Sequence, residues 1–385
     1  MTAEPGGHLA VPTVGMVGAG QLARMTGQAA VSLGIGFRVL ADTAQDSAAQ
    51  VCPATMVGDY RFLPDLKAFA AGCDVVTFDH EHVPGEHLAE LAAVVPTHPG
   101  AQALRYTQDK LAMRERLRSM GMPCPRYTTV AGMADVERFA ADVGWPVVLK
   151  AVSGGYDGRG VWVCQGPSEA AEVLGHGVTV FAEAHVAFVR ELAALVARST
   201  AGQAAAYPVV QTVQRDGVCH EVLAPAPGLD PDTACDAQRW ALHLCGELGV
   251  TGLLAVEFFQ TRDGLLVNEL AMRPHNSGHW TIEGAMTSQF EQHLRAVLGL
   301  PLGDPRPAAP YAVMANVLGG DDPHIYQRLT HVMAADPGVK VHLYGKPVRR
   351  GRKVGHVTVT GRQVRELRAR AVEAARYLAH GEGPV

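Results

Sequence analysis

The sequence contains little that would suit a membrane protein, a disulfide-bonded protein or a nucleic-acid binder. No apolar run approaches the roughly 20 residues that cross a bilayer, and residues 1–12 lack the basic and apolar parts of a signal peptide. The seven cysteines are scattered without a Cys-x-x-Cys pair, which indicates reduced thiols rather than disulfides or a zinc site. Lys and Arg number 33 against 38 Asp and Glu, and the net charge of −5 argues against general nucleic-acid binding. We therefore expect a cytoplasmic protein without membrane or nucleic-acid partners, in which residues 1–12 form a disordered extension.

The first hundred residues alternate short apolar strands with helices. Strands are expected at residues 14–17, 37–41 and 74–78, and the first is followed by a helix that runs to about Leu33. Such alternation predicts a parallel α/β sheet covered on both faces. Ligands of these sheets bind beyond the carboxyl ends of the strands. Gly20, Asp79 and Glu81 therefore lie at the edge where a ligand is expected.

The rest of the chain divides into three further parts. A charged helix is expected at 109–120, then two strands, 147–151 and 161–164, joined by a glycine-rich loop. From Glu191 the chain is rich in strands, with helices at 232–248 and 286–298. Four prolines between 301 and 310 mark a linker into a compact C-terminal piece. The predicted boundaries are 13–107, 108–190, 191–302 and 303–385.

Two glutamates face each other across a predicted β-hairpin. The apolar runs 253–259 and 265–270 flank Thr261-Arg262-Asp263-Gly264, and Asp-Gly between apolar runs is a strong hairpin signal. Glu257 and Glu269 lie within these runs, where charge is costly unless it is paired or bound to a metal. Followed by Arg273, His275 and Asn276, the two carboxylates can hold Mg²⁺ beside a phosphoryl group. The alternative is a pair of structural salt bridges.

A first glycine cluster follows the first strand. Gly18-x-Gly20-x-x-Ala23, with Asp42 at the end of the next strand, matches the dinucleotide-binding fingerprint. An NAD-dependent dehydrogenase built on Gly18 to Ala23 is therefore one alternative function. A helix N-terminus of this kind also binds other phosphates, including a sugar monophosphate.

A second glycine cluster lies between the strands 147–151 and 161–164. Its sequence is Ser-Gly-Gly-Tyr-Asp-Gly-Arg-Gly at 153–160, and Lys150 precedes it. Glycines let such a loop fold over a polyphosphate with its backbone N–H groups exposed. Lys150 adds a point charge and Arg159 a bidentate fork suited to phosphate or carboxylate. The alternative is an ordinary hairpin loop.

Together these motifs resemble the ATP-grasp superfamily. The strings Gly-Tyr-Asp-Gly-Arg-Gly at 155–160, Arg-Pro-His-Asn-Ser-Gly-His at 273–279 and Gly-Arg-Lys-Val-Gly-His at 351–356 narrow the resemblance to the 5-(carboxyamino)imidazole ribonucleotide synthetases of purine biosynthesis. The similarity spans roughly residues 13 to 360. It implies an α/β, partly α+β, ATP-grasp fold. The four parts become a Rossmann-like N-terminal domain, a lid subdomain, a core with the metal site and a small β-rich C-terminal piece.

The resemblance also implies a reaction. ATP and bicarbonate would give carboxyphosphate, which carboxylates the exocyclic amine of 5-aminoimidazole ribonucleotide and leaves ADP and phosphate. ATP and Mg²⁺ would be required, and the protein would be a homodimer. Another ATP-grasp amine ligase and a catalytically silent nucleotide-binding protein are the remaining alternatives.

The resemblance assigns a role to each matching residue. The metal ligands would be Glu257 and Glu269. The residues around ATP would be Arg105, Lys150, Gly155, Tyr156, Asp157, Gly158, Arg159, Gly160, Glu183, Ala184, Val186, Glu191, Gln214, Asn268 and Glu269. Those around the substrate nucleotide would be Gly20, Gln21, Leu22, Asp79, Glu81, Arg350 and Lys353. Catalysis would fall to Tyr156, Asp157, Arg159, Arg273, His275, Asn276 and Lys353.

The chain departs from the family pattern in two places. Asp79-His80-Glu81-His82 stands where the family often has Phe-Glu-Asn, and Gln214 replaces a usual histidine near the nucleotide. Glutamine still forms hydrogen bonds but carries no charge.

Overall fold

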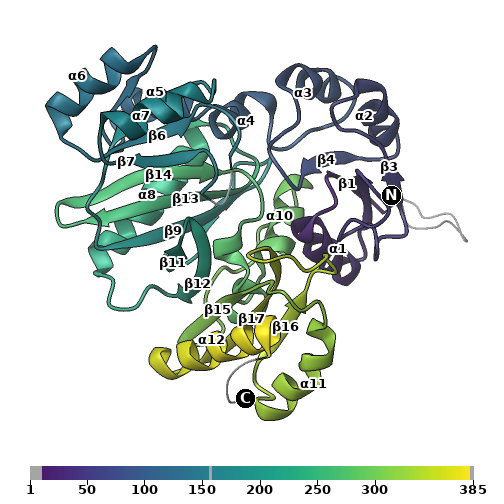
Figure 1. The fold of residues 1–385 in the computed structure, drawn as a ribbon. Helices are drawn as coiled ribbons and strands as arrows, with labels where there is room; N and C mark the ends of the chain where they lie inside the picture. The colour runs from purple at the N-terminus through teal and green to yellow at the C-terminus, as the bar shows by residue number, and fades with distance from the viewer. Residues whose placement is uncertain (1–10, 156–157, 382–385) are drawn as a thin grey trace, which may run out of the picture.

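Three β-sheets organise the computed structural model, which describes residues 11–155 and 158–381. Figure 1 shows the N-terminal parallel sheet on the right and the C-terminal helices at the bottom. A second sheet, formed within residues 127–184 and called the lid sheet below, lies at the upper left. The mixed α/β class predicted from the sequence is confirmed. Residues 1–10, 156–157 and 382–385 lie outside the description, so the predicted extension is largely outside it as well.

The N-terminal sheet is parallel, with strand order β3-β2-β1-β4. Its strands are β1 (Thr13–Val17), β2 (Gly36–Ala41), β3 (Thr55–Val57) and β4 (Val75–Phe78). The helices around it are α1 (Gln21–Leu33), α2 (Leu63–Ala70) and α3 (Gly85–Ala92). The sequence predicted three of these strands and missed β3, because three residues are too few for a recognisable alternation. β1 lies between β2 and β4, so the turn after β1 and the end of β4 share one edge.

Two helices connect this sheet to the rest of the chain, α4 (Ala101–Gln108) and α5 (Lys110–Ser119). Asp109 ends the first and caps the second, because its carboxylate accepts a hydrogen bond of 2.8 Å from the Ala112 amide. This cap fixes Lys110 in the first turn of α5. The predicted helix at 109–120 thus forms, and α4 precedes it directly.

The lid sheet is antiparallel, with strand order β5-β8-β6-β7. Its strands are β5 (Tyr127–Thr129), β6 (Val147–Ala151), β7 (Val161–Cys164) and β8 (Val180–Ala184). Two helices pack on it, α6 (Met133–Val143) and α7 (Pro167–Gly175). The predicted glycine-rich loop does join β6 to β7, so its described residues project from one end of this sheet.

The largest sheet has nine strands and carries both the core and the C-terminal piece. Its path is β14-β13-β9-β11-β12-β15-β17-β16, and β10 pairs with β9. The strands are β9 (Arg190–Arg198), β10 (Ala204–Ala206), β11 (Val210–Arg215), β12 (Val218–Ala224), β13 (Gly252–Thr261), β14 (Gly264–Ala271), β15 (Tyr311–Leu318), β16 (Lys340–Leu343) and β17 (Lys353–Gly361). The associated helices are α8 (Pro231–Glu247), η1 (Asn276–Gly278), α9 (Thr281–Gly284), α10 (Gln289–Val297), α11 (Ile325–Ala335) and α12 (Val364–His380).

The expected hairpin and C-terminal piece both belong to this sheet. β13 and β14 form the hairpin, with Thr261 paired to Gly264 at its turn. β15 pairs with β12, so the strands after the proline-rich linker extend the core sheet. Helix α10 starts at Gln289 rather than at 286, because Ser288 caps it by accepting from the Glu291 amide.

Helix α10 joins the N-terminal sheet to the core. Leu294 is fully buried among Val14, Ala30, Val75 and Val297, which come from both units. Among the described residues, no helix is both long and apolar enough to cross a membrane.

We expect Leu294→Ala to lower the free energy of unfolding by about 2–5 kcal/mol, because it leaves a cavity between two packed units. The matched control is Val31→Ala on α1, whose side chain is 82% exposed and whose loss changes stability by less than about 0.5 kcal/mol. Denaturant unfolding followed by circular dichroism measures both. Equal stability of the two variants would contradict the assigned interface.

Candidate active site

Two cavities meet at the predicted glutamate pair. The larger has a volume of ≈ 640 Å³ and lies where the start of α1, the end of β4, the glycine-rich loop and β13–β14 converge. The smaller has a volume of ≈ 260 Å³ and lies between α5, the lid strands and β13–β14. Glu257, Glu269 and Lys110 line both. A group bound between the two glutamates would therefore touch the contents of both cavities.

Glu257 and Glu269 are direct cross-strand partners, as predicted. Like charges in this position repel each other, and burial together with Glu269 raises the pKa of Glu257 above its usual range. The Nζ atom of Lys110 lies 3.3 Å from Glu269 Oε1. Glu257 therefore resists ionisation beside Glu269 in the metal-free protein, and a bound cation would favour its ionised form.

A β-bulge aims β14 at the smaller cavity. The register shifts after Glu257, so Asn268 is an extra residue on β14. In a regular strand Asn268 and Glu269 would point to opposite faces. With the bulge, both side chains line the smaller cavity.

The donor set fits Mg²⁺ bound together with phosphate. Among the described residues, no group of three or more His, Cys, Asp or Glu side chains forms a complete metal site. Mg²⁺ is commonly held by one or two carboxylates, with the remaining positions filled by phosphate oxygens and water. Glu257 and Glu269 supply the carboxylates that this arrangement needs.

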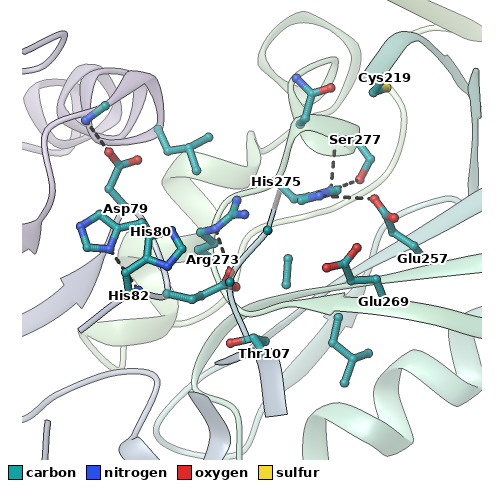
Figure 2. A pocket seen from close by; sticks show the side chains of 18 of the residues that line it. Asp79, His80, His82, Thr107, Cys219, Glu257, Glu269, Arg273, His275 and Ser277 are labelled. Carbon is teal, nitrogen blue, oxygen red and sulfur yellow. Dashed lines mark hydrogen bonds and ion pairs between the residues drawn. The ribbon is translucent and has the colours of Figure 1, made fainter. Parts of the chain in front are cut away.

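His275 faces Glu257 in a defined tautomer (Figure 2). The Ser277 amide donates to His275 Nδ1 over 3.3 Å, so the proton lies on Nε2, which is 3.5 Å from Glu257 Oε1. Burial, together with Arg273 and Lys353, lowers the pKa of His275 to about 3. His275 is therefore neutral near pH 7 and presents an N–H donor beside the glutamate pair.

Arg273 and Asn276 are held by partners from other elements. Glu81 accepts a hydrogen bond of 2.8 Å from the Met272 amide and lies 3.4 Å from the Arg273 Nε atom. Asn276 and Asn316 exchange two side-chain hydrogen bonds of 3.0 and 2.8 Å. Arg273, His275, Asn276 and Lys353 all line the larger cavity. The structure thus brings together the predicted catalytic residues from 273 onward.

The glycines of the first cluster pack against the residues that follow β4. Asp79 accepts hydrogen bonds from the amides of Gly20 and Ala23 at the start of α1. A Cβ atom on Gly20 would lie 2.5 Å from Asp79 Oδ2, and one on Gly18 would lie 2.8 Å from His80. These glycines therefore make room for Asp79 and His80. This packing argues against a dinucleotide at the same turn.

His80 and His82 line the larger cavity beside Asp79 (Figure 2). Their rings stack with centroids 5.3 Å apart, and the His82 amide donates to His80 Nδ1 over 3.2 Å. Burial lowers the pKa of His80 to about 4 and also lowers that of His82. The departure from the family pattern thus supplies two neutral imidazoles, while Asp79 and Glu81 already bind backbone amides.

The smaller cavity is bounded by a buried ion cluster. Glu183 is 2% exposed, is bonded to Arg114 Nε and lies 2.7 Å from Lys150 Nζ. Burial alone would raise the pKa of Glu183, but Arg114 and Lys150 outweigh it and lower the pKa. Lys150 also donates to Asn268 Oδ1 over 3.1 Å, and Arg114 donates to the Asn268 carbonyl over 2.7 Å. The cluster ties α5, β6, β8 and β14 together around the cavity.

Other residues predicted for ATP also line the smaller cavity. They are Gly158, Ala184, Val186, Glu191 and Gln214. Burial raises the pKa of Glu191 to about 7. His185 lines this cavity too. Gly155, Gln21 and Leu22 line the larger one.

Among the residues that the structure describes, four that were predicted for the site line neither of the two cavities. Arg105 is exposed on α4, and Arg350 forms a surface ion pair of 2.9 Å with Asp321. Arg159 is exposed on the glycine-rich loop, and Gly160 lies against Ala151. Tyr156 and Asp157 lie outside the described residues.

Sequence reasoning missed several cations at the site. Lys110 lines both cavities, Arg114 lines the smaller one, and Lys346 lines the larger one and donates to the Gln21 side chain. The four-residue spacing of Lys110 and Arg114 after the helix-capping Asp109 was a usable signal, because it places both on one helix face. Lys346 opens the basic run 346–353, whose composition alone does not indicate which of its residues enters the site.

Three protein families match successive parts of the chain. The ribonucleotide synthetase preATP-grasp domain matches residues 11–108, and the ATP-grasp domain matches residues 115–290, which confirms the ATP-grasp fold predicted from the sequence. The phosphoribosylaminoimidazole carboxylase C-terminal domain matches residues 312–370.

Whole-chain relatives agree with these matches. The N5-carboxyaminoimidazole ribonucleotide synthase of Mycobacterium bovis is 56% identical, over 96% of this chain and 88% of its own length. That of Corynebacterium ammoniagenes is 46% identical, over 97% of this chain and 94% of its own.

Solved structures are also similar over nearly the whole chain. The synthetase from Thermus thermophilus has a TM-score of 0.86 and 38% identity, covering 97% of this chain and 99% of its own. The synthase from Aspergillus clavatus, in complex with ADP and 5-aminoimidazole ribonucleotide, has a TM-score of 0.88 and 31% identity, covering 97% of this chain and 99% of its own.

Glu257→Gln is expected to stabilise the metal-free protein at alkaline pH. The raised pKa of Glu257 means that the folded state resists its ionisation. Glu257 therefore lowers the free energy of unfolding wherever the unfolded state is ionised and the folded state is not. This loss is absent at a pH where Glu257 is protonated in both the folded and the unfolded state, and it grows as the pH rises from about 4.5 through the raised pKa. At about pH 8.5 we expect the variant to gain on the order of 1 kcal/mol or more, and at about pH 4 nothing.

Denaturant unfolding in the presence of a chelator at these two pH values measures the effect. The control is Glu247→Gln, because Glu247 pairs with Arg116 at the surface and is half exposed. A gain of the same size at both pH values would show that ionisation of Glu257 is not its cause.

Proposed function

The chain belongs to the N5-carboxyaminoimidazole ribonucleotide synthase family, and we propose that its two joined cavities are where ATP, bicarbonate and 5-aminoimidazole ribonucleotide react. The protein is an ATP-dependent ligase of purine biosynthesis that carboxylates 5-aminoimidazole ribonucleotide. The position of Glu257 and Glu269 at the junction of the cavities is the main support for placing the reaction there. A phosphoryl group transferred from one cavity to the other would lie beside these carboxylates.

ATP would occupy the smaller cavity. Its apolar walls, such as Val161, Val163 and Phe188, suit a base, and Glu191 suits the ribose hydroxyls. Lys150 would exchange part of its contact with Glu183 for a phosphate oxygen. Glu257 and Glu269 would hold Mg²⁺, which neutralises phosphate charge during transfer when it is bound.

Bicarbonate and the nucleotide would occupy the larger cavity. A bicarbonate oxygen attacks the γ-phosphorus, the bond to the β-phosphate oxygen breaks and ADP leaves. The exocyclic amine then attacks the carbonyl carbon of carboxyphosphate, phosphate leaves and the amine releases one proton. Arg273 and the His275 Nε2–H group would hold the anionic oxygens in place.

The 5′-phosphate would lie near the start of α1. Asp79 already accepts from the Gly20 and Ala23 amides, so a second anion there needs additional positive charge. Lys346 and Lys353 line this cavity and supply it. We propose these lysines as phosphate ligands in preference to Arg350, which lies in a surface pair.

Phosphate release separates this function from its alternatives. With ATP, Mg²⁺ and bicarbonate present, 5-aminoimidazole ribonucleotide should stimulate phosphate release, whereas other amine nucleotides should not. Glu269→Gln should reduce turnover by at least about 100-fold, because it removes an anionic metal ligand from the phosphoryl-transfer step. Glu247→Gln serves as the control.

A rate that does not depend on the imidazole nucleotide would contradict the acceptor. Wild-type turnover of Glu269→Gln would remove Glu269 from the metal site. NADH titration followed by fluorescence tests the dehydrogenase alternative, and binding of NADH at the first glycine cluster would favour it.

Three further expectations remain predictions: the domain boundaries at 107/108, 190/191 and 302/303, a cytoplasmic location and a homodimer. We expect multi-angle light scattering to give a mass near twice the 40.8 kDa of the chain. A mass of one chain at the concentrations used for the assay would contradict the homodimer.

A further inference from the structure

One buried side chain holds the segment that carries His275 without lining either cavity. Gln289, the first residue of α10, is fully buried. Its Oε1 atom accepts from the His275 amide over 2.9 Å, and its Nε2 group donates to the His275 carbonyl over 2.8 Å. The side-chain amide thus pairs with both backbone groups of one residue, as a neighbouring strand would.

The same amide also sets the tautomer of a second histidine. Gln289 Nε2 lies 3.0 Å from His279 Nδ1. An amide nitrogen only donates, so His279 Nδ1 accepts and its proton lies on Nε2. His279 is fully buried, and burial lowers its pKa well below the usual value. Gln289 therefore fixes both ends of the turn from His275 to His279.

The surrounding residues are shaped to admit this amide. A Cβ atom on Gly278 would collide with Gln289 Oε1. Thr281 Oγ1 donates to the Gly278 carbonyl over 2.6 Å and accepts from the backbone N–H of Gln289 over 2.8 Å. The turn is thus fastened to α10 by main-chain and side-chain bonds together.

We propose that Gln289 is a positioning residue for the carboxylation reaction. By clamping the His275 backbone, it holds the His275 Nε2–H group at the glutamate pair, where the anionic intermediate would lie. This inference rests on the proposed role of His275. Gln289 itself touches no substrate, since it is not among the described residues that line the cavities.

The same helix provides a matched control. Gln292 is also fully buried, and its side chain donates to the Gly303 carbonyl over 2.9 Å and accepts from the Gly303 amide over 2.7 Å. Neither Gln292 nor Gly303 is among the described cavity-lining residues. Gln292 thus forms the same bidentate clamp one turn along, on a segment away from the site.

The test compares Gln289→Met with Gln292→Met. Each variant loses a buried bidentate clamp, and Gln289→Met also loses the hydrogen bond to His279 Nδ1, so its stability should fall at least as far as that of Gln292→Met. We expect kcat to fall about 100-fold in Gln289→Met, because small misplacements of reacting groups cost this much. It should change less than about 3-fold in Gln292→Met, and the KM for ATP should stay within a similar factor in both. Equal kcat values for the two variants would overturn the proposal.

Gln289→Glu adds a readout that a purely structural role would not move. Protonated, the introduced carboxyl can still donate one hydrogen bond; ionised, it faces the His275 carbonyl and His279 Nδ1 with lone pairs only. The kcat ratio of this variant to wild type should therefore rise as the pH falls, whereas the ratio for Gln289→Met should be flat. A flat ratio for Gln289→Glu would overturn the proposal even if Gln289→Met fails to fold.

His275→Phe separates failure of the inference from failure of the proposed function. If His275→Phe is inactive and Gln289→Met is as active as Gln292→Met, only the role of Gln289 is lost. If His275→Phe retains wild-type kcat, the proposed role of His275 fails and the inference fails with it. Imidazole ¹⁵N shifts of His279 report the tautomer directly, with Nε2 protonated in wild type and a changed pattern expected in Gln289→Met.

Discussion

The site is organised around two carboxylates that the sheet forces to face each other. Glu257 and Glu269 are cross-strand partners, and their repulsion is relieved either by protonation of Glu257, whose pKa is raised, or by nearby positive charge. Lys110 approaches one of them, and the neutral His275 offers an N–H group to the other. A divalent cation that arrives with phosphate would favour the ionised form of both carboxylates. The metal-free fold thus disfavours a second negative charge at the point where the cavities join.

The lid sheet is attached to the core through a second group of charged residues, in which the acid is directly paired with two cations. Glu183 is buried, but Arg114 and Lys150 neutralise it directly. Removing one member of such a cluster leaves an uncompensated buried charge, which is strongly destabilising. The two arrangements serve different ends: the cluster around Glu183 fixes α5, β6 and β8 against β14, whereas Glu257 and Glu269 line the cavities, where a bound cation can reach them.

Local signals predicted most of the fold, and the hairpin in particular. Asp263-Gly264 between apolar runs fixed the pairing of Glu257 with Glu269, and the glycine-rich loop joined two strands as expected. The bulge at Asn268 was not predictable, because it depends on pairing across the sheet. Nor was the surface pair of Arg350 with Asp321 or the approach of Lys346 to Gln21, since these residues meet only through tertiary packing. The roles of Tyr156 and Asp157 stay predictions.

Tertiary packing also explains why the positioning of His275 was invisible in the sequence. Gln289 and Gln292 are the same residue type, in the same helix, with the same burial and the same bidentate hydrogen bonds. Each satisfies the backbone of a segment that lacks a strand partner at that point, as buried backbone groups require. They differ in what they hold: Gln292 binds Gly303, which follows the last helix of the core. Gln289 binds His275, which faces the glutamate pair, and also donates to His279 Nδ1. The proposed contribution of Gln289 to catalysis therefore depends on the position of His275, because Gln292 offers the same side-chain amide to Gly303 away from the site.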